Sequence, residues 1–294
     1  MRIRATVAAA SGALALSALA VPAAHADGGP SYRSEVAKVF AQQTSGKAAI
    51  SATPAPEGDL GVSFSDFKIA KAIKVGTTAP VSAVVSYKLT YGADVDIDAD
   101  SFLSFAGIYR GDPDDPSAGQ GGDEPATCVA TSATTATCKG AIDIDPTELD
   151  PEFRLRNWQA GTWHAAAVAL DVKAEKSSTQ FDLATTLVQR NSRLTVNAAP
   201  EPVKKGRTLT VTGKLSRANW ETRKYAGYTN QSVKLQFRKK GSSTYTTLKT
   251  ITSNSTGDLK TTTTASVDGY YRFAFGGTTT TPAVNATGDF VDVQ

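Results

Sequence analysis

The chain has 294 residues, of which 31 are Lys or Arg and 28 are Asp or Glu, so its formal net charge at pH 7 is +3. A chain of this length with 40% hydrophobic residues can bury substantial cores. The nearly balanced charge argues against a nucleic-acid-binding role for the chain as a whole. Thr, Val, Ala and Gly are abundant and no long amphipathic helical pattern appears, which favours an all-β protein.

The first 26 residues have the layout of a secretory signal peptide. Arg2 and Arg4 form a charged start, residues 5–20 are largely apolar, and Ala24-His25-Ala26 is a small-x-small cleavage signal. The two arginines are not adjacent, so this is not a twin-arginine signal, and the apolar stretch is too short and alanine-rich for a membrane span. We therefore expect a secreted, extracellular protein that starts near Asp27 and does not insert into membranes.

Residues 27–60 are expected to form a flexible leader. The segment is rich in Gly, Ser, Ala and Pro, a composition typical of spacers, and only residues 34–42 could form a short helix.

Residues 61–190 are predicted to form a first β-sandwich, because β-like segments follow one another about every ten residues. The clearest strand alternates apolar and polar side chains over residues 83–91, as expected when one face is buried. Trp163 and Phe105 are the predicted core anchors. Further strands are expected at residues 102–109, 162–172 and 181–189, and in a hairpin around the cysteines.

Cys128 and Cys138 are the two cysteines of the chain. They stand ten positions apart, and equal arms around the turn would place their sulfur atoms opposite each other across a hairpin. In an exported protein such a pair is expected to form a disulfide. A redox pair or a metal site would need C-x-x-C spacing or further ligands, which the sequence lacks, so the predicted disulfide is structural.

Residues 191–294 are predicted to form a second, immunoglobulin-like sandwich. About seven strand-like segments in about 100 residues match the size and rhythm of that fold. Val233, Leu235 and Phe237 alternate with charged or polar residues, which is typical of a half-buried strand. Pro200 and Pro202 indicate a strand break. The expected fold class is therefore all-β, with two tandem immunoglobulin-like β-sandwiches after a signal peptide and a flexible leader.

Short stretches of both predicted domains carry a resemblance to a known family. These stretches are Ala160-Gly161-Thr162-Trp163, the run from Leu194 to Gly206, Arg217-Ala218-Asn219-Trp220, Tyr225-Ala226-Gly227-Tyr228, Val233-Lys234-Leu235-Gln236-Phe237 and Phe290-Val291-Asp292-Val293. In these stretches the chain resembles secreted two-domain β-sandwich proteins of high-GC Gram-positive bacteria, some of which are labelled calcium-binding. The resemblance extends over nearly the whole chain, and it implies export and tandem sandwiches but no active site.

Charge is distributed unevenly along the chain. Between Asp94 and Glu152 there are 14 acidic residues and two basic ones, whereas residues 191–294 carry 15 basic and six acidic residues. An acidic first domain is therefore followed by a basic second domain.

The acidic residues offer candidate ligands for calcium, a hard cation that takes six to eight oxygen ligands. The candidate ligands are Asp94, Asp96, Asp98, Asp112, Asp114 and Asp115. Counted from Asp94, the sixth position is Ala99 rather than Gly and the twelfth is Phe105 rather than Glu, so this is not an EF-hand. Two interpretations stay open: a solvated acidic rim, or a calcium site where two acidic loops meet. Calcium is the one cofactor that the sequence suggests.

No catalytic motif is recognisable in the sequence. His164 is the single histidine after the signal peptide, and we expect it to be a half-buried or surface residue. The chain lacks a Gly-x-Ser-x-Gly elbow, a His-Glu-x-x-His motif and a phosphate-binding glycine loop followed by Lys and Ser or Thr. Carboxylate pairs suited to glycoside hydrolysis arise by chance in so Asp-rich a chain. We therefore expect no enzyme.

Basic and aromatic residues of the second domain form a predicted binding surface. Its members are Lys204, Lys205, Arg207, Arg217, Trp220, Arg223, Lys224, Tyr225 and Tyr228. Those from Arg217 onward are expected in a long insertion between two strands, and Arg238-Lys239-Lys240 forms a further cluster near a turn. Anionic cell-wall polymers or another extracellular protein are the expected partners, and nucleic acid is not. For Trp220 itself a structural role, covering an open sandwich edge, is favoured over a role in the binding surface.

The leading functional hypothesis is a secreted, non-catalytic binding or structural protein of the extracellular space or cell wall. Its attachment would be noncovalent, because the chain has no Leu-Pro-x-Thr-Gly sorting signal. One alternative is a calcium-binding protein with the ion in acidic loops of the first domain. Another is a secreted protease inhibitor that presents the cysteine hairpin.

Overall fold

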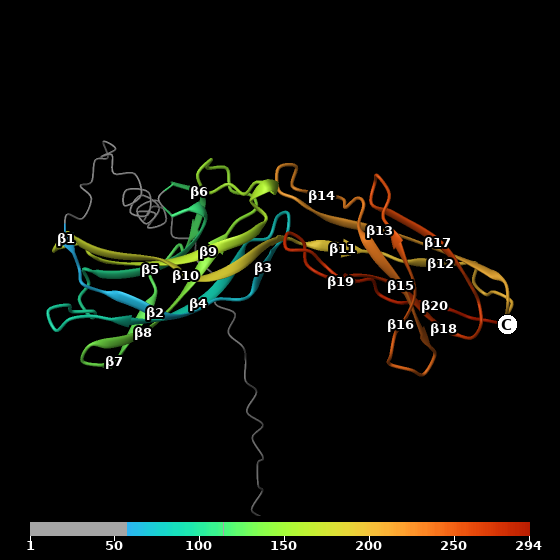
Figure 1. The fold of residues 1–294 in the computed structure, drawn as a ribbon, viewed down its shortest axis with the longest axis horizontal. Helices are drawn as coiled ribbons and strands as arrows, with labels where there is room; N and C mark the ends of the chain where they lie inside the picture. The colour runs from blue at the N-terminus through green and yellow to red at the C-terminus, as the bar shows by residue number, and fades with distance from the viewer. Residues whose placement is uncertain (1–57, 114) are drawn as a thin grey trace, which may run out of the picture. The chain divides into compact units, whose positions relative to one another are not determined.

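The computed structural model describes residues 58–113 and 115–294, which form two β-sandwiches (Figure 1). The predicted signal peptide, nearly all of the predicted leader and Asp114 lie outside the described residues. The described part is built from strands and one 3-10 turn, η1 (Asn157–Gln159). The predicted all-β fold with two tandem β-sandwiches is confirmed. No helix in these two ranges is long and apolar enough to span a membrane.

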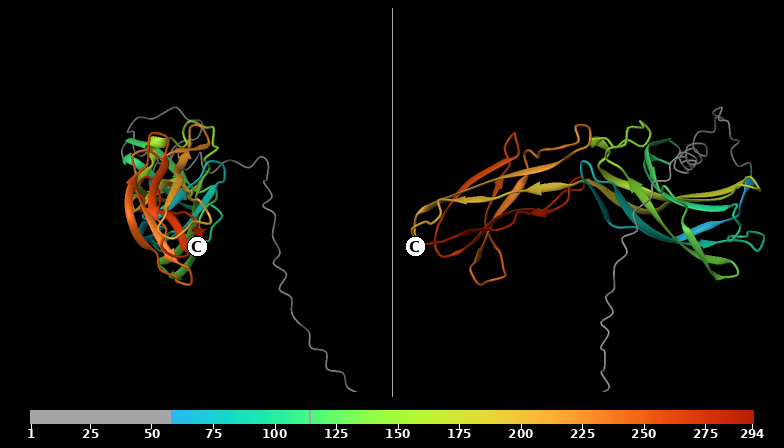
Figure 2. Two further views of the ribbon diagram at one scale, coloured as in Figure 1. Left: turned by 90° about the vertical axis from the view of Figure 1, so that its right-hand side faces the viewer. Right: turned by 180° about the vertical axis from the view of Figure 1, so that it is seen from behind.

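The first sandwich consists of a large and a small sheet (Figure 2). The large sheet contains β1 (Gly58–Asp59), β3 (Ala72–Val75), β5 (Phe102–Asp112), β6 (Asp115–Gly121), β9 (Gly161–Asp171) and β10 (Lys176–Arg190). The small sheet has the order β2 (Ser63–Lys68), β4 (Val81–Thr90), β8 (Thr135–Ile144) and β7 (Thr127–Ser132). Because β1 pairs with β10 and Leu60 is buried, residues 58–60 belong to this sandwich rather than to the predicted leader.

The core of the first sandwich follows the predicted alternation. Along residues 83–91 the odd-numbered side chains are buried against the large sheet. Trp163 is fully buried, and its indole N–H donates a 2.8 Å hydrogen bond to the carbonyl oxygen of Gln159. Phe105 is buried as well, but it packs with Val168 in a small separate cluster instead of the main core. Both predicted anchors are therefore interior residues.

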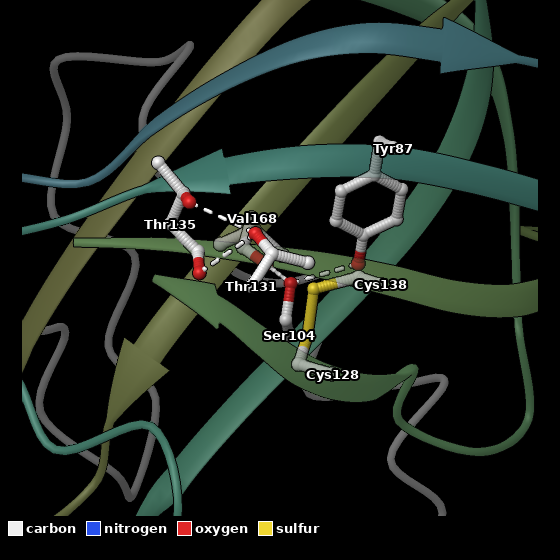
Figure 3. Close-up of a disulfide and its surroundings, with 7 residues drawn as sticks. All are labelled: Tyr87, Ser104, Cys128, Thr131, Thr135, Cys138 and Val168. Carbon is white, nitrogen blue, oxygen red and sulfur yellow. Dashed lines mark hydrogen bonds between the residues drawn. A yellow bond between two sulfur atoms is a disulfide. The ribbon is translucent and has the colours of Figure 1, made fainter. Parts of the chain in front are cut away.

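The predicted disulfide between Cys128 and Cys138 is confirmed (Figure 3). The two cysteines lie directly opposite each other on β7 and β8, with 4.0 Å between their Cα atoms. Beside Cys138, the hydroxyl of Tyr87 lies 2.8 Å from Ser104 Oγ, which donates in turn to the carbonyl of Val168 at 3.1 Å. This chain of hydrogen bonds connects the two sheets inside the core, and burial raises the pKa of Tyr87 far above its usual range.

The second sandwich also has two sheets. One contains β11 (Ser192–Leu194), β12 (Asn197–Ala199), β13 (Thr208–Asn219), β14 (Lys224–Gly227) and β17 (Asp258–Thr264). The other contains β15 (Ser232–Lys239), β16 (Thr246–Thr252), β18 (Gly269–Phe275), β19 (Val284–Asn285) and β20 (Asp289–Val291). Strand β12 ends directly before Pro200, as the proline predicted. Leu209, Leu235 and Phe273 are fully buried between the sheets.

The predicted insertion after residue 217 is a continuation of the sheet. Strand β13 runs on to Asn219 and pairs with β14, so the segment is a hairpin instead of an irregular loop. Trp220, at the turn of this hairpin, is buried in the core of the first sandwich. Its backbone N–H donates to Asn157 Oδ1 at 3.0 Å, and Asn157 Nδ2 donates to Asn219 Oδ1 at 3.0 Å.

Candidate anion-binding surface

The acidic loop between β4 and β5 holds Asp94, Asp96 and Asp98, and all three are exposed. The loop consists of turns and not of a strand. Its apolar members Val95 and Ile97 pack against the core while the aspartates point outward. The alternation of the sequence therefore comes from an amphipathic loop, in which Asp96 Oδ1 accepts a 3.0 Å hydrogen bond from the backbone N–H of Asp98.

The other predicted calcium ligands belong to the hairpin between β5 and β6. Asp112 is exposed and its backbone pairs with that of Asp115, while Asp114 is outside the described residues. In residues 58–113 and 115–294, no group of three or more acidic, His or Cys side chains is placed to hold a metal ion. Calcium binding stays a prediction, which a comparison of melting temperatures in calcium and in EDTA would test.

The structure brings two predicted basic clusters together at one end of the second sandwich. The turn Lys204-Lys205-Gly206-Arg207 precedes β13, and Lys239 and Lys240 follow from the end of β15. The last residues of the chain lie between them, because the backbone N–H of Lys205 donates to the carbonyl of Gln294 at 2.7 Å. On the other side, the backbone N–H of Lys240 donates to the carbonyl of Asp268 at 2.9 Å.

Glycine makes the first of these turns possible. Gly206 has a φ of +81°, in the left-handed region that favours glycine, and the backbone N–H of Arg207 closes the turn on the carbonyl of Lys204 at 3.1 Å. Lys204, Lys205 and Arg207 are all exposed around this turn.

We call the surface formed by Lys204, Lys205, Arg207, Lys239 and Lys240 the basic end. Two open hollows lie there. One hollow, of about 430 Å³, is lined by Pro200, Pro202, Val203, Lys204, Gly206, Arg207 and Thr208. The other, of about 470 Å³, is lined by Lys205, Lys239, Lys240, Ser266, Val267, Asp268, Val293 and Gln294. All five basic side chains are exposed.

One acidic side chain pairs with the basic end. Lys240 Nζ lies 3.3 Å from Asp268 Oδ2, and within the described residues the other four cations form no ion pair. The hydrogen bond from the backbone N–H of Val293 lowers the pKa of Asp268 most, and the ion pair with Lys240 lowers it further. This carboxylate therefore stays ionised at neutral pH. The basic end therefore keeps a surplus of positive charge, which attracts anions over a Debye length of about 10 Å at 0.1 M salt.

The rest of the predicted binding surface lies at the opposite end of β13, and two of its members are not exposed. Trp220 is buried in the first core, and Tyr228 is buried against Phe275 with 5.7 Å between the ring centroids. The guanidinium carbon of Arg217 lies 3.8 Å from the ring centroid of Tyr228. Neither ring is therefore available as part of the binding surface, and the burial of Trp220 agrees with the structural role favoured for it.

Arg223, Lys224 and Tyr225 lie on the same hairpin. Arg223 Nη2 donates to the carbonyl of Thr147 in the first sandwich at 2.9 Å. Tyr225 is half-buried, and its ring centroid lies 3.6 Å from the guanidinium carbon of Arg193. Lys224 is exposed. The single binding surface predicted from the sequence is therefore two separate features in the structure, the basic end and a structural hairpin.

The outer face of the β15–β18–β20 sheet carries arginine and aromatic side chains, of which only Arg238 belongs to a cluster predicted from the sequence. Arg238, Tyr270 and Phe290 are directly opposite one another on the three strands. The guanidinium of Arg238 lies 4.0 Å from the ring centroid of Tyr270, whose ring is 5.1 Å from that of Phe290. The period-2 alternation along β18 could have revealed this face from the sequence, because it places Tyr270 and Arg272 on the same side of the strand.

His164 is part of a polar network on the first sandwich. Its Nδ1 lies 2.7 Å from Asp182 Oδ1, which also accepts a 2.8 Å hydrogen bond from the hydroxyl of Tyr109. Burial and the contact with Asp182 raise the pKa of Tyr109. The His164 side chain is 40% exposed, in line with the expected half-buried or surface position.

Comparisons with known proteins give no functional assignment. No protein-family model and no curated protein matches the chain. Among solved structures it is similar to fibronectin(III)-like modules of Clostridium thermocellum CbhA, at 12% identity and a TM-score of 0.28, over 79% of this chain and 92% of that one. It is also similar to the D0-D1 domain of Intimin, at 14% identity and a TM-score of 0.25, over 78% of this chain and 98% of that one. At these values the likenesses carry no argument about function.

Proposed function

We propose that this chain is a secreted, non-catalytic binding protein whose basic second sandwich attaches noncovalently to anionic polymers of the cell wall or extracellular space. The basic end carries the proposal, because five basic side chains from separate turns meet there around two hollows and one carboxylate pairs with them. The signal-peptide pattern and the resemblance to secreted proteins of high-GC Gram-positive bacteria support the extracellular setting.

The expected binding is electrostatic and does not need a deep pocket. Residues 191–294 carry 15 basic and six acidic residues, so the positive charge of the whole domain adds to that of the basic end. Exposed charges are screened over about 8 Å at physiological ionic strength, so affinity should fall steeply as salt is added.

Co-sedimentation with purified cell walls tests the proposal. The mature chain, residues 27–294, should sediment with the walls at low ionic strength and be released by about 0.5 M salt, where the Debye length is only several ångströms. A variant with K204Q, K205Q, R207Q and K239Q should lose most of this binding.

The matched control removes four positive charges from the first sandwich instead, at the exposed residues Lys68, Lys71, Lys74 and Lys88. It should sediment nearly as well as the wild type. Absence of wild-type sedimentation at low salt would contradict the proposed function. Equal losses in both variants would contradict the basic end as its site.

A further inference from the structure

We infer that the outer face of β15 and β18 is a preformed binding site for an anionic polysaccharide, with Arg238 and Arg272 as its anion-binding groups. The inference rests on the proposed function and specifies the class of polymer. It concerns a surface distinct from the basic end, although Lys240 adjoins both, because Lys240 lines one hollow and its Nζ lies 5.3 Å from the ring centroid of Phe290.

Aromatic rings hold both guanidinium groups in place. The guanidinium of Arg272 lies 3.7 Å from the ring centroid of Tyr245, and that of Arg238 lies 5.3 Å from the same ring and 4.0 Å from Tyr270. Arg272 Nε also donates a 2.8 Å hydrogen bond to Gln236 Oε1. The two guanidinium groups therefore flank one tyrosine, with much of their side-chain freedom already lost before any ligand binds.

The charges of these two arginines lack an acidic partner. Within residues 58–113 and 115–294, no carboxylate forms an ion pair with Arg238 or Arg272, although both side chains are half-buried. A guanidinium has five N–H donors, and the hydrogen bonds to Gln236 and to the carbonyl of Ser242 use one donor from each arginine. The remaining donors are available to an oxyanion, which a guanidinium binds through two parallel hydrogen bonds.

The surroundings of the arginines favour a polymer built of sugar rings. Tyr245, Tyr270 and Phe290 are half-exposed on the same face and offer apolar edges beside the charged groups. A sheet face of this kind suits an extended polysaccharide chain, which can place a sugar ring against an aromatic edge and a carboxylate against a guanidinium group. A polyanion without rings, such as polyphosphate, would bind the charged groups but gain nothing from the aromatic edges.

A glycine permits this arrangement. Tyr245 comes from the loop between β15 and β16, and a Cβ atom added at Gly288 would clash with its hydroxyl oxygen. Gly288→Ala should therefore move Tyr245 off the face while the net charge stays the same. The clash is with the far end of a flexible side chain, and the second neighbour, Tyr270 Cβ at 3.2 Å, needs to move by only a few tenths of an ångström, so the backbone can stay in place.

Binding of two probes, polygalacturonate and polyphosphate, tests the inference at low salt. R238K/R272K preserves the charge but loses the planar forks, which bind phosphate as well as carboxylate, so its affinity for polygalacturonate should fall about tenfold and its affinity for polyphosphate should fall as well. Gly288→Ala, which disturbs the aromatic contacts, should lower the affinity for polygalacturonate but change that for polyphosphate less than about twofold. The control R110K/R154K, two equivalent changes in the first sandwich, should bind both polymers like the wild type.

Each outcome decides a different claim. Unchanged polygalacturonate binding by R238K/R272K, or a Gly288→Ala variant that binds polygalacturonate like the wild type or loses both polymers equally, would overturn the inference and leave the proposed function standing. Failure of the wild type to bind either polymer would contradict the proposed function itself. If R238K/R272K fails to fold, as judged by its melting temperature, Gly288→Ala alone decides.

Discussion

The indole N–H of Trp220 donates a 3.1 Å hydrogen bond to the backbone carbonyl of Gly76, so a side chain of the second sandwich is buried among residues of the first. Trp220 is 1% exposed, and the two bonded residues are 144 positions apart in the chain. The two sandwiches therefore share part of one core.

Replacing this side chain should cost much of the stability that the shared core provides. Trp220→Ala leaves a large cavity, and we expect it to lower the free energy of unfolding by about 3–5 kcal/mol. Trp220→Phe keeps most of the apolar area but leaves the carbonyl of Gly76 without its donor, so it should cost about 1–3 kcal/mol. Urea unfolding followed by circular dichroism measures both values, and a cost below that of ordinary surface changes for Trp220→Ala would contradict the shared core.

The disulfide should make a clear contribution to the first sandwich. Because the Cys128–Cys138 loop is short, the chain-entropy account gives about 2–3 kcal/mol for this bond. We expect C128A/C138A to melt several degrees lower than the wild type in calorimetry. Reduction of the wild type should give a similar shift, and an unchanged melting temperature in both experiments would show that the bond adds no stability.

The buried hydrogen bonds between the two sheets of the first sandwich should be energetically coupled. Tyr87→Phe removes one donor and should cost about 0.5–1.5 kcal/mol. Ser104→Ala removes the partner of both Tyr87 and Val168 and should cost more. In a double-mutant cycle the costs should not add, because the second change deletes a bond that the first has already lost. Additive costs would mean that the two hydroxyls do not interact.

Stability should depend on pH through Asp268. The pKa of this carboxyl is lowered in the folded chain by the N–H of Val293 and by Lys240, so its stabilising effect is complete above the unfolded pKa of about 4. That effect is lost as the pH falls through the lower, folded pKa. Asp268→Asn should therefore melt below the wild type at pH 7, and the difference should shrink below about pH 4. A difference that is constant from pH 7 to pH 2 would refute this assignment.

The sequence predicts features that depend on neighbouring residues, and it misses those that depend on distant ones. The strand at residues 83–91, the cysteine hairpin and the break at Pro200 follow from local alternation, spacing and backbone chemistry. For Trp220 the sequence favours a structural role but does not predict its place, because its hydrogen-bond acceptor Gly76 lies in the other sandwich. The local expectation is a ring that covers an open sandwich edge, whereas the structure buries it in the core of the first sandwich.

The candidate site shows the same division. The turns that carry Lys204 and Lys240 are visible in the sequence, but their meeting depends on the pairing of Val203 with Val293, which brings the end of the chain between them. The outward positions of Arg238 and Arg272 follow from strand alternation. That Tyr245 lies between their guanidinium groups depends on a loop and on Gly288, which no local pattern connects.

The salt dependence of binding to a defined polyanion tests the central claim most directly. We would measure the dissociation constant of residues 27–294 for polygalacturonate between 20 mM and 300 mM salt, together with the variant K204Q/K205Q/R207Q/K239Q. The account predicts that the logarithm of the affinity falls steadily with that of the salt concentration, and that the variant binds more weakly with a shallower slope. An affinity that does not respond to salt, or a variant that binds like the wild type, would contradict it.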